Sequence, residues 1–246
     1  MVLPGAEPAS FPGGPNGVLV VHGFTGNPSS MRPLATAIAD AGYTVELPRL
    51  PGHGTTVEDM VPTRWVDWSD AAAGAYDELS SRCSRVAVAG LSMGGTLAAW
   101  LAATNPAVAA VVLINPMIEP PPDELIDALR AVDEEVMPGI GSDIAKPDVA
   151  ESAYAGTPVA PLLSFLLDGV RPLSGQLASV RCPVLLFTST QDHVVAPTSS
   201  DYLANGVSGP IERIDLERSY HVATLDYDAE EIESRTVEFL AKVFTA

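Results

Sequence analysis

Apolar residues along the chain gather in short runs rich in β-branched side chains, and each run ends at a polar or turn-forming segment. Runs of this length without strict alternation are typical of strands that are buried on both faces of a sheet. We therefore expect strands at residues 17–22, 43–47, 85–89, 109–114, 184–188 and 211–216.

Between these runs lie segments in which apolar residues recur at helical spacing. The expected helices span residues 30–41, 63–81, 94–104, 197–205 and 228–244. We expect Ser29 or Ser30 to cap the first helix, Gly42 to end it and Thr63 to cap the second. This alternation predicts an α/β fold with right-handed crossovers and a mostly parallel sheet covered by helices on both faces.

The alternation is interrupted after Asn115. Residues 116–180 contain proline clusters, short helical pieces and no convincing strand, and the alternation then resumes. We interpret residues 1–115 and 181–246 as one α/β core and residues 116–180 as an insertion into it. A length of 246 residues suits a single core, because α/β domains commonly reach this size.

Composition and charge exclude several classes of protein. Hydrophobic residues make up 47% of the chain and charged residues 18%, which suits a packed globule rather than a disordered chain. The formal net charge of -18 repels phosphate backbones and anionic membrane surfaces, so nucleic acid is not an expected partner. The same charge also serves solubility, and it carries no information about chemistry.

We expect neither a secretion signal nor a membrane span. Residues 1–17 lack a basic start followed by an apolar run, and no segment offers about 18 uninterrupted apolar residues. We therefore expect a cytoplasmic protein without stable membrane insertion. The two cysteines, Cys83 and Cys182, have no metal-ligand or CxxC spacing, and we expect buried thiols near the starts of strands.

Residues 90–94 (GLSMG) match the nucleophile elbow GxSxG, with Ser92 at the centre. In that motif, glycines permit a sharp turn from strand to helix that lifts the serine hydroxyl clear of the sheet. The bare pattern also arises by chance, and the alternative is an ordinary tight turn with an incidental serine. The predicted strand before it and the predicted helix after it favour a nucleophile.

A serine hydroxyl is a weak nucleophile at neutral pH, so Ser92 requires a histidine base and an acid that orients this base. In this fold the order along the chain is serine, acid, histidine, and the last two lie on loops after later strands. His221 follows the last predicted strand, whereas His22 and His53 precede the serine. Asp192 directly follows an earlier predicted strand, and we predict Asp192 and His221 as the partners of Ser92.

Three other residues are weaker candidates for these roles. His193 adjoins Asp192, and neighbouring loop residues usually point apart, so the two are poorly placed to pair with each other. Asp215 lies within a predicted strand and Asp226 follows the histidine, so both break the required order.

Attack of a serine nucleophile on a carbonyl also needs hydrogen-bond donors for the oxyanion of the tetrahedral intermediate. One donor in this fold is the backbone N–H after the nucleophile, here Met93, and the second lies in the loop after an earlier strand. Residues 22–26 (HGFTG) form such a loop, so we expect the N–H of Phe24 to be the second donor. The alternative for this loop is an ordinary turn between a strand and a helix.

Taken together, these motifs resemble those of bacterial monoacylglycerol lipases and small carboxylesterases of the α/β-hydrolase superfamily. The resemblance rests on the segments VLVVHGFTGNPSSMRPLA, LPRLPGHGTTVEDM, GLSMGGTLAAW, GSDIAKPDVAESAY, QDHVVAP and SYHVATLDYD. It implies a catalytic triad of Ser92, Asp192 and His221, with oxyanion donors at Phe24 and Met93. It also implies that the insertion forms a small cap over a pocket for one acyl chain and a small alcohol.

The insertion holds many apolar side chains for its length: Leu125, Leu129, Val136, Met137, Ile140, Leu162, Leu163, Phe165, Leu166 and Leu167. These side chains either line an acyl tunnel, with Ile140, Leu162 and Leu166 as candidate substrate contacts, or merely dock the cap on the core. Glu151 could accept hydrogen bonds from glycerol hydroxyls, or it could be a solvated carboxylate on a helix face.

The expected reaction is hydrolysis of a carboxylic ester through an acyl-enzyme, with no metal and no organic cofactor. The implied substrate is a small lipid ester, most simply a monoacylglycerol that yields a fatty acid and glycerol. One alternative is a general short- to medium-chain carboxylesterase or thioesterase with the same triad. Another is a ligand-binding protein on a hydrolase scaffold that has lost its chemistry.

Overall fold

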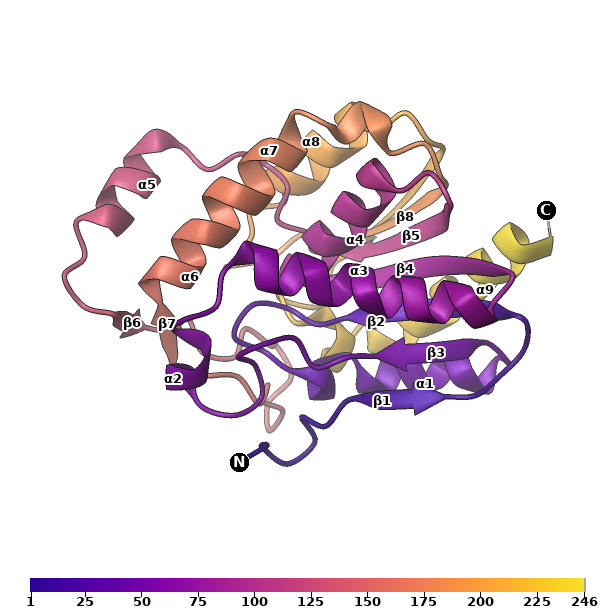
Figure 1. Ribbon diagram of the computed structural model, residues 1–246, viewed down its shortest axis with the longest axis horizontal. Helices are drawn as coiled ribbons and strands as arrows, with labels where there is room; N and C mark the ends of the chain where they lie inside the picture. Colours follow the sequence, from indigo (N-terminus) through magenta and orange to yellow (C-terminus); the bar gives the residue numbers. More distant parts are fainter. Residues whose placement is uncertain (246) are drawn as a thin grey trace.

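A seven-stranded sheet in the order β1-β3-β2-β4-β5-β8-β9 forms the centre of the computed structural model, which describes residues 1–245. Neighbouring strands run parallel except at one edge, where β1 pairs antiparallel with β3 (Figure 1). The mostly parallel sheet predicted from the sequence is therefore confirmed.

The strands of this sheet are β1 (Ala9–Phe11), β2 (Asn16–Val21), β3 (Thr44–Leu47), β4 (Arg85–Leu91), β5 (Val108–Ile114), β8 (Val184–Ser189) and β9 (Ile211–Leu216). The strands β2, β4, β5 and β8 are buried along nearly their whole length, which explains their continuous apolar runs. The edge strand β1 was not predicted, because it has only three residues, none of them fully buried.

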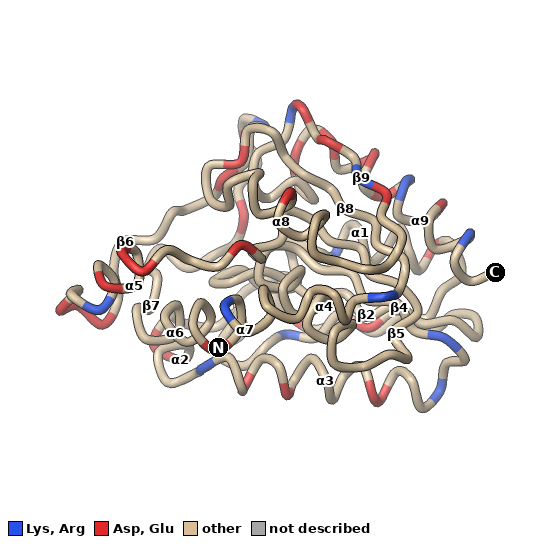
Figure 2. The backbone as a smooth tube through the Cα atoms, turned by 90° about the horizontal axis from the view of Figure 1, so that it is seen from above, with Lys and Arg blue, Asp and Glu red and all other residues tan. Residues whose placement is uncertain are grey.

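The helices of the core are η1 (Pro28–Ser30), α1 (Arg32–Asp40), α2 (Val57–Met60), α3 (Trp65–Arg82), α4 (Met93–Thr104), α8 (Thr198–Gly206), η4 (Ala223–Leu225) and α9 (Ala229–Thr245). They cover both faces of the sheet (Figures 1 and 2). On one face, Trp68 of α3 and Leu97 of α4 belong to one buried core. On the other, Ile38 of α1 and Leu240 of α9 belong to a second.

Two predicted helix caps were wrong. Ser29 and Ser30 lie in the separate turn η1, and α1 begins only at Arg32. The turn η1 is capped by Asn27, whose side chain accepts the Ser29 N–H at 3.0 Å. The Thr63 hydroxyl donates to the Met60 carbonyl at 2.7 Å, so it is engaged in the preceding turn and does not cap α3. The residue that caps α3 is Arg64.

Residues 116–180 fold into α5 (Asp123–Arg130), β6 (Val136–Pro138), β7 (Gly156–Pro158), α6 (Val159–Ser164), the π-helical turn η2 (Phe165–Val170), α7 (Arg171–Ser174) and η3 (Leu177–Ser179). The strands β6 and β7 pair antiparallel, so the expectation of no strand here was wrong. Both strands are three residues long and contain proline, so the sequence shows no strand pattern at these positions. Figure 1 shows α5, α6 and this hairpin gathered at the end of the sheet where β2 and β3 finish.

The two cysteines precede β4 and β8 as expected, but Cys83 and Cys182 are partly rather than fully buried. Burial raises the pKa of the Cys182 thiol to about 11. A helix long and apolar enough to cross a bilayer is not present in residues 1–245.

Candidate active site

Ser92 lies at the sharp turn between β4 and α4. Its φ of 55° and ψ of -116° are backbone angles that side-chain-bearing residues rarely adopt, so the surrounding structure must hold the turn in place. Ser92 N–H donates to the Ile114 carbonyl at 2.9 Å, and the Ser92 carbonyl accepts the Thr96 N–H at 3.0 Å. A Cβ on Gly90 would lie 2.1 Å from the Gly94 carbonyl oxygen, so this turn requires glycine at position 90.

His221 and Asp192 form a buried pair. His221 Nδ1 lies 2.7 Å from Asp192 Oδ2, and the two side chains are 8% and 2% exposed. Asp192 Oδ1 accepts the N–H groups of Val194 and Val195, both at 2.8 Å. Because the carboxylate is an acceptor, His221 Nδ1 carries the proton and Nε2 is the basic nitrogen.

Ser92 and His221 line the same cavity, which has a volume of about 330 Å³. No hydrogen bond within residues 1–245 joins the Ser92 hydroxyl to His221 in this structure. Such bonds often tighten only when substrate is bound, so the absence of this bond does not exclude His221 as a base for Ser92.

Asn115 anchors the backbone of His221, a role that was not predicted from the sequence. Its Nδ2 donates to the His221 carbonyl at 2.8 Å and to Ser189 Oγ at 2.9 Å, while its Oδ1 accepts the Ser189 N–H at 2.7 Å. Asn115 directly follows the buried strand β5, at the same edge of the sheet as Ser92. A polar residue at that place is the sequence feature that could have identified it.

The loop at residues 22–26 lies against Ser92. A Cβ on Gly23 would be 3.4 Å from Ser92 Cβ, which shows how closely the loop backbone approaches the turn. The Phe24 ring lines the cavity and stacks on Phe165, with ring centroids 5.9 Å apart. Met93 begins α4, and the first turn of a helix leaves its N–H groups without intrahelical partners.

His22, the first residue of this loop, and His53 are fully buried, with ring centroids 5.0 Å apart. His22 Nε2 accepts the Leu50 N–H at 3.1 Å, and the Nδ1 atoms of His22 and His53 contact the carbonyls of Gly23 and Pro51. Burial lowers the pKa of His22 to about 4. Burial, reinforced by the neighbouring His22, lowers the pKa of His53 to about 3.

Because the pKa values of His22 and His53 are lowered, we expect the folded protein to lose stability in mild acid. Their pKa values in the folded protein lie below the value of 6.5 of an unperturbed histidine, so their stabilising effect is full above pH 6.5 and falls as pH drops toward 4 and 3. Between about pH 6.5 and 5, each imidazole should remove roughly 1.5 kcal/mol from the free energy of unfolding. Urea titrations over this pH range would measure the decline.

His53→Gln should make this decline shallower, because it removes one of the two groups that bind protons only on unfolding. His193→Gln, which removes an exposed imidazole, should leave a steep decline. Equal slopes for the wild-type protein and His53→Gln would contradict this explanation.

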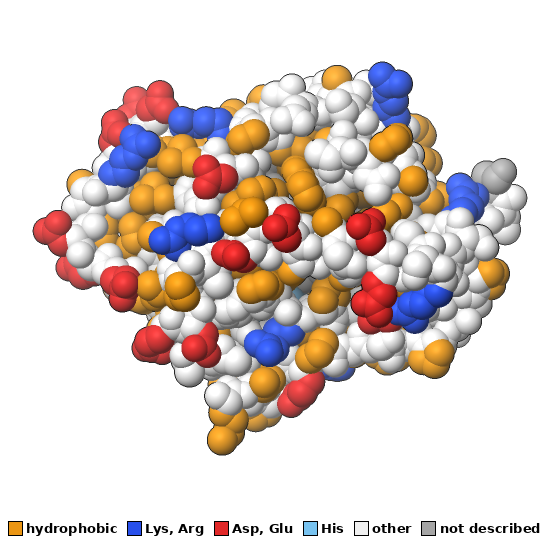
Figure 3. Space-filling model, viewed as in Figure 1, with side chains coloured by type: hydrophobic (Ala, Val, Ile, Leu, Met, Phe, Trp, Pro, Cys, Tyr) orange, Lys and Arg blue, Asp and Glu red, His pale blue; other side chains and the backbone are white. Residues whose placement is uncertain are grey.

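The predicted substrate contacts Ile140, Leu162 and Leu166 all line the cavity that contains Ser92. Other apolar side chains of residues 116–180, such as Leu163 and Leu167, pack against the buried core instead. Some apolar side chains of residues 116–180 therefore line the cavity, and others dock this segment on the core. Ile140 is 68% exposed at the mouth of the cavity, and Figure 3 shows hydrophobic side chains gathered over α6 and α7.

Glu151 lines the same cavity from a segment without helix, so its interpretation as a solvated residue on a helix face was wrong. The carboxylate is close to the loop at residues 22–26, because a Cβ on Gly26 would lie 2.7 Å from Glu151 Oε1. Burial raises the pKa of the Glu151 carboxyl, although nearby His221 and a hydrogen bond with Ser30 oppose this shift. Glu151 is therefore one of two carboxylates, with Asp143, in a cavity whose lining is mostly apolar.

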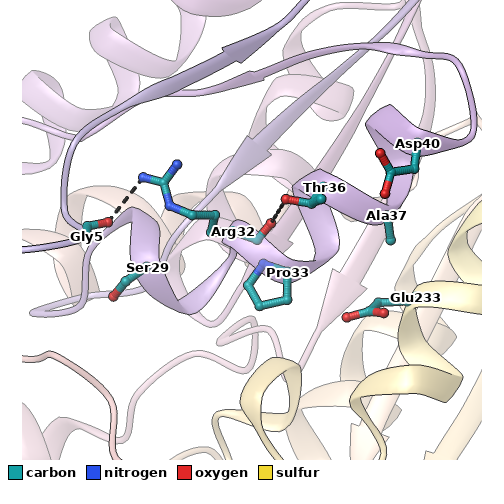
Figure 4. Close-up of a pocket in the computed structure, with 8 residues that line it drawn as sticks. All are labelled: Gly5, Ser29, Arg32, Pro33, Thr36, Ala37, Asp40 and Glu233. Carbon is teal, nitrogen blue, oxygen red and sulfur yellow. Dashed lines mark hydrogen bonds between the residues drawn. The ribbon is translucent and has the colours of Figure 1, made fainter.

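A larger hollow of about 540 Å³ lies between α1 and the start of α9 (Figure 4). The Arg32 guanidinium donates to the Gly5 carbonyl at 3.1 Å. The residues that line this hollow are Gly5, Ser29, Arg32, Pro33, Thr36, Ala37, Asp40 and Glu233. They include no histidine to activate a nucleophile, so the cavity at Ser92 is the better candidate active site. Within residues 1–245, no cluster of three or more potential metal ligands is found.

The chain is similar to known lipolytic enzymes over nearly its whole length. It is 47% identical over 244 residues to a thermostable monoacylglycerol lipase of Bacillus sp. strain H-257, covering 98% of this chain and 96% of that protein. It is 27% identical over 239 residues to a carboxylesterase of Bacillus subtilis strain 168, covering 96% and 97% of the two chains. A solved structure from a study of the metagenome-derived lipolytic enzymes LipS and LipT matches with a TM-score of 0.94 and 42% identity, covering 98% of this chain and 100% of that one.

These similarities confirm the resemblance that the sequence motifs indicated. A family model described as the alpha/beta hydrolase family matches residues 18–234. The chain therefore belongs to the alpha/beta hydrolase family.

Proposed function

We propose that this carboxylic ester hydrolase cleaves monoacylglycerols to a fatty acid and glycerol through an acyl-enzyme on Ser92. The observation that carries the proposal is the His221–Asp192 pair, joined at 2.7 Å, whose imidazole lines one cavity together with Ser92. The 47% identity to a protein named thermostable monoacylglycerol lipase supports the choice of substrate.

The first half of the reaction forms the acyl-enzyme. His221 Nε2 takes the proton of the Ser92 hydroxyl as Oγ attacks the ester carbonyl, and Asp192 holds the ring in the required tautomer. The N–H groups of Phe24 and Met93 donate to the oxyanion that develops. The C–O bond to the alcohol then breaks, and His221 gives its proton to the departing glycerol oxygen.

The second half releases the fatty acid. Water enters the place of glycerol, and His221 Nε2 takes a proton from it as its oxygen attacks the acyl-enzyme carbonyl. Collapse of the second tetrahedral intermediate returns the proton to Ser92 Oγ. In this scheme, every proton transfer passes through a single imidazole nitrogen.

The lining of the cavity fits an ester with one acyl chain. Its apolar wall is formed by Leu129, Met137, Leu162, Phe165 and Leu166. A volume of about 330 Å³ lies at the lower end of the range for small-molecule sites, which favours an ester with one acyl chain over one with three. We propose that residues 116–180, which supply this wall, act as a cap over the α/β core.

A substrate panel tests the proposal. We expect kcat/KM to be highest for monoacylglycerols and lower by at least about 10-fold for diacylglycerols and triacylglycerols, a difference of roughly 1.4 kcal/mol in transition-state binding. p-Nitrophenyl esters of increasing chain length would serve as reference substrates without glycerol.

The second candidate function is that of a general carboxylesterase or thioesterase with the same triad. It is favoured by the similarity to a carboxylesterase over 96% of this chain. Equal kcat/KM for monoacylglycerols and simple esters of matched chain length would favour this candidate and would count against the glycerol-specific function.

Glu151 is the residue that we propose for recognition of glycerol. Glu151→Gln should raise KM for monoacylglycerols about 10-fold, because a hydrogen bond from a hydroxyl to a partly buried carboxylate is worth roughly 1.5 kcal/mol. The same substitution should leave kcat/KM for p-nitrophenyl esters within about 2-fold, since these esters carry no glycerol hydroxyl. Steady-state kinetics with both substrates measure the difference.

Glu124→Gln provides a matched control, because Glu124 is an exposed carboxylate on α5. Glu124→Gln should change neither KM for monoacylglycerols nor kcat/KM for p-nitrophenyl esters. Unchanged monoacylglycerol kinetics in Glu151→Gln would exclude Glu151 as a glycerol contact.

A further inference from the structure

Asp143, in the loop between β6 and β7, contacts the two loops that carry His221 and Asp192. Its Oδ2 accepts the N–H of His193 at 3.2 Å and the N–H of His221 at 3.1 Å. Its Oδ1 lies 2.8 Å from His193 Nδ1. The side chain of Asp143 is only 12% exposed, so its carboxylate is largely shielded from water, whereas the His193 side chain is 59% exposed.

One carboxylate oxygen therefore joins the backbone of two loops that lie far apart in sequence. His193 directly follows Asp192, and the other N–H belongs to His221 itself. The distance between these two backbone positions determines whether the His221–Asp192 hydrogen bond of 2.7 Å can form. Hydrogen bonds to a charged acceptor are stronger than those to a neutral one, so Asp143 is suited to hold the loops together.

Further hydrogen bonds hold the segment around Asp143 against the His221 loop. The Asp143 carbonyl accepts the Val222 N–H at 3.0 Å. The fully buried Asp226 carboxylate accepts the N–H groups of Ala145 at 2.6 Å and Tyr220 at 2.9 Å. The segment is thus attached on both sides of His221, which fixes where the Asp143 carboxylate lies.

We propose that Asp143 is a positioning residue that holds the His221 and Asp192 loops at the separation required for proton transfer. This inference rests on the proposed function of Ser92, His221 and Asp192. Asp143 belongs to residues 116–180, so this segment supports the chemistry of the core in addition to forming the wall of the cavity.

Asp143→Ala tests the proposal because it removes the shared acceptor. We expect kcat for p-nitrophenyl esters to fall about 10- to 100-fold, the size of loss caused by small misplacement of a catalytic group. Asp143 also lines the cavity, but the apolar residues of its wall are unchanged, so KM should stay within about 2-fold. Asp143→Asn keeps one oxygen at this place and should restore kcat to within about 5-fold of the wild-type value.

The matched control is Asp201→Ala, which removes an exposed carboxylate that pairs with Arg213 on the surface. It should leave kcat and KM unchanged. A second readout is the low-field proton resonance of His221 Nδ1–H, which reports the hydrogen bond to Asp192. This resonance should be lost or broadened in Asp143→Ala and retained in Asp201→Ala.

A measurement on the wild-type protein keeps the proposal falsifiable if Asp143→Ala does not fold. The N–H groups of His193 and His221 should exchange slowly with solvent, because both donate to a shielded carboxylate. Exchange of both at the rate of an unprotected loop would overturn the proposal.

The outcomes also separate this inference from the proposed function. A wild-type protein that hydrolyses no ester and is not labelled at Ser92 by a fluorophosphonate would refute the proposed function. An active wild-type protein together with a folded Asp143→Ala that keeps both kcat and the low-field resonance would refute only the positioning role.

Discussion

Ser92→Ala should lower kcat for ester hydrolysis by about 10⁴- to 10⁶-fold, the range found when a serine hydrolase loses its nucleophile. The loss is this large because no acyl-enzyme can form without Ser92 Oγ, and the remaining donors stabilise only an unassisted attack of water. The turn itself should persist, since alanine and serine meet the same steric conditions at a φ of 55°. Steady-state kinetics and circular dichroism of the purified variant measure the two effects.

A fluorophosphonate probe should add one label to the wild-type protein, on Ser92, and none to Ser92→Ala. His221→Ala should lose activity to a similar extent, and the double variant should be no worse, because the two groups act as one unit. Retained turnover in Ser92→Ala would refute the assignment of the nucleophile. A wild-type protein that shows no acyl-enzyme burst with any ester would instead favour a ligand-binding protein on this scaffold.

The central sheet was predictable because its strands are buried on both faces. Such strands need no polar positions, so β4, β5 and β8 appear in the sequence as unbroken apolar runs. The short strands β1, β6 and β7 give no such pattern, and two of them contain proline. Helix starts were also missed, because the hydroxyls of Ser30 and Thr63 bond to carbonyls in preceding turns.

The triad candidates were predictable because the fold assigns each of them to the end of a particular strand. Order along the chain was then enough to choose His221 over His22 and His53. The neighbours of His221 were not predictable in the same way. Asn115 and Asp143 act through hydrogen bonds to the backbone of distant loops, and no local pattern in the sequence records such contacts.

Gly94→Ala should destabilise the protein by about 3–5 kcal/mol, the upper range for a single substitution. A Cβ on Gly94 would lie 2.2 Å from the Val21 carbonyl oxygen and 2.7 Å from that of His22. Both atoms belong to backbone at the end of β2, which pairs with β3 and β4 at the centre of the sheet, so neither can move without disturbing that pairing. Urea unfolding monitored by circular dichroism would measure the change.

Gly74→Ala is the matched control for the added methyl group. Gly74 lies within α3, and apart from its chain neighbours and the nearby backbone of α3 itself, no heavy atom is within 4 Å of the place where its Cβ would be. This substitution should raise the free energy of unfolding by up to about 1 kcal/mol, because alanine favours a helix more than glycine does. The two variants add the same atoms to helices on the same face of the sheet. If Gly94→Ala lowers the free energy of unfolding and Gly74→Ala raises it, the destabilisation is due to the contact between α4 and β2. Equal stability of Gly94→Ala and wild type would mean that α4 does not pack this closely on β2.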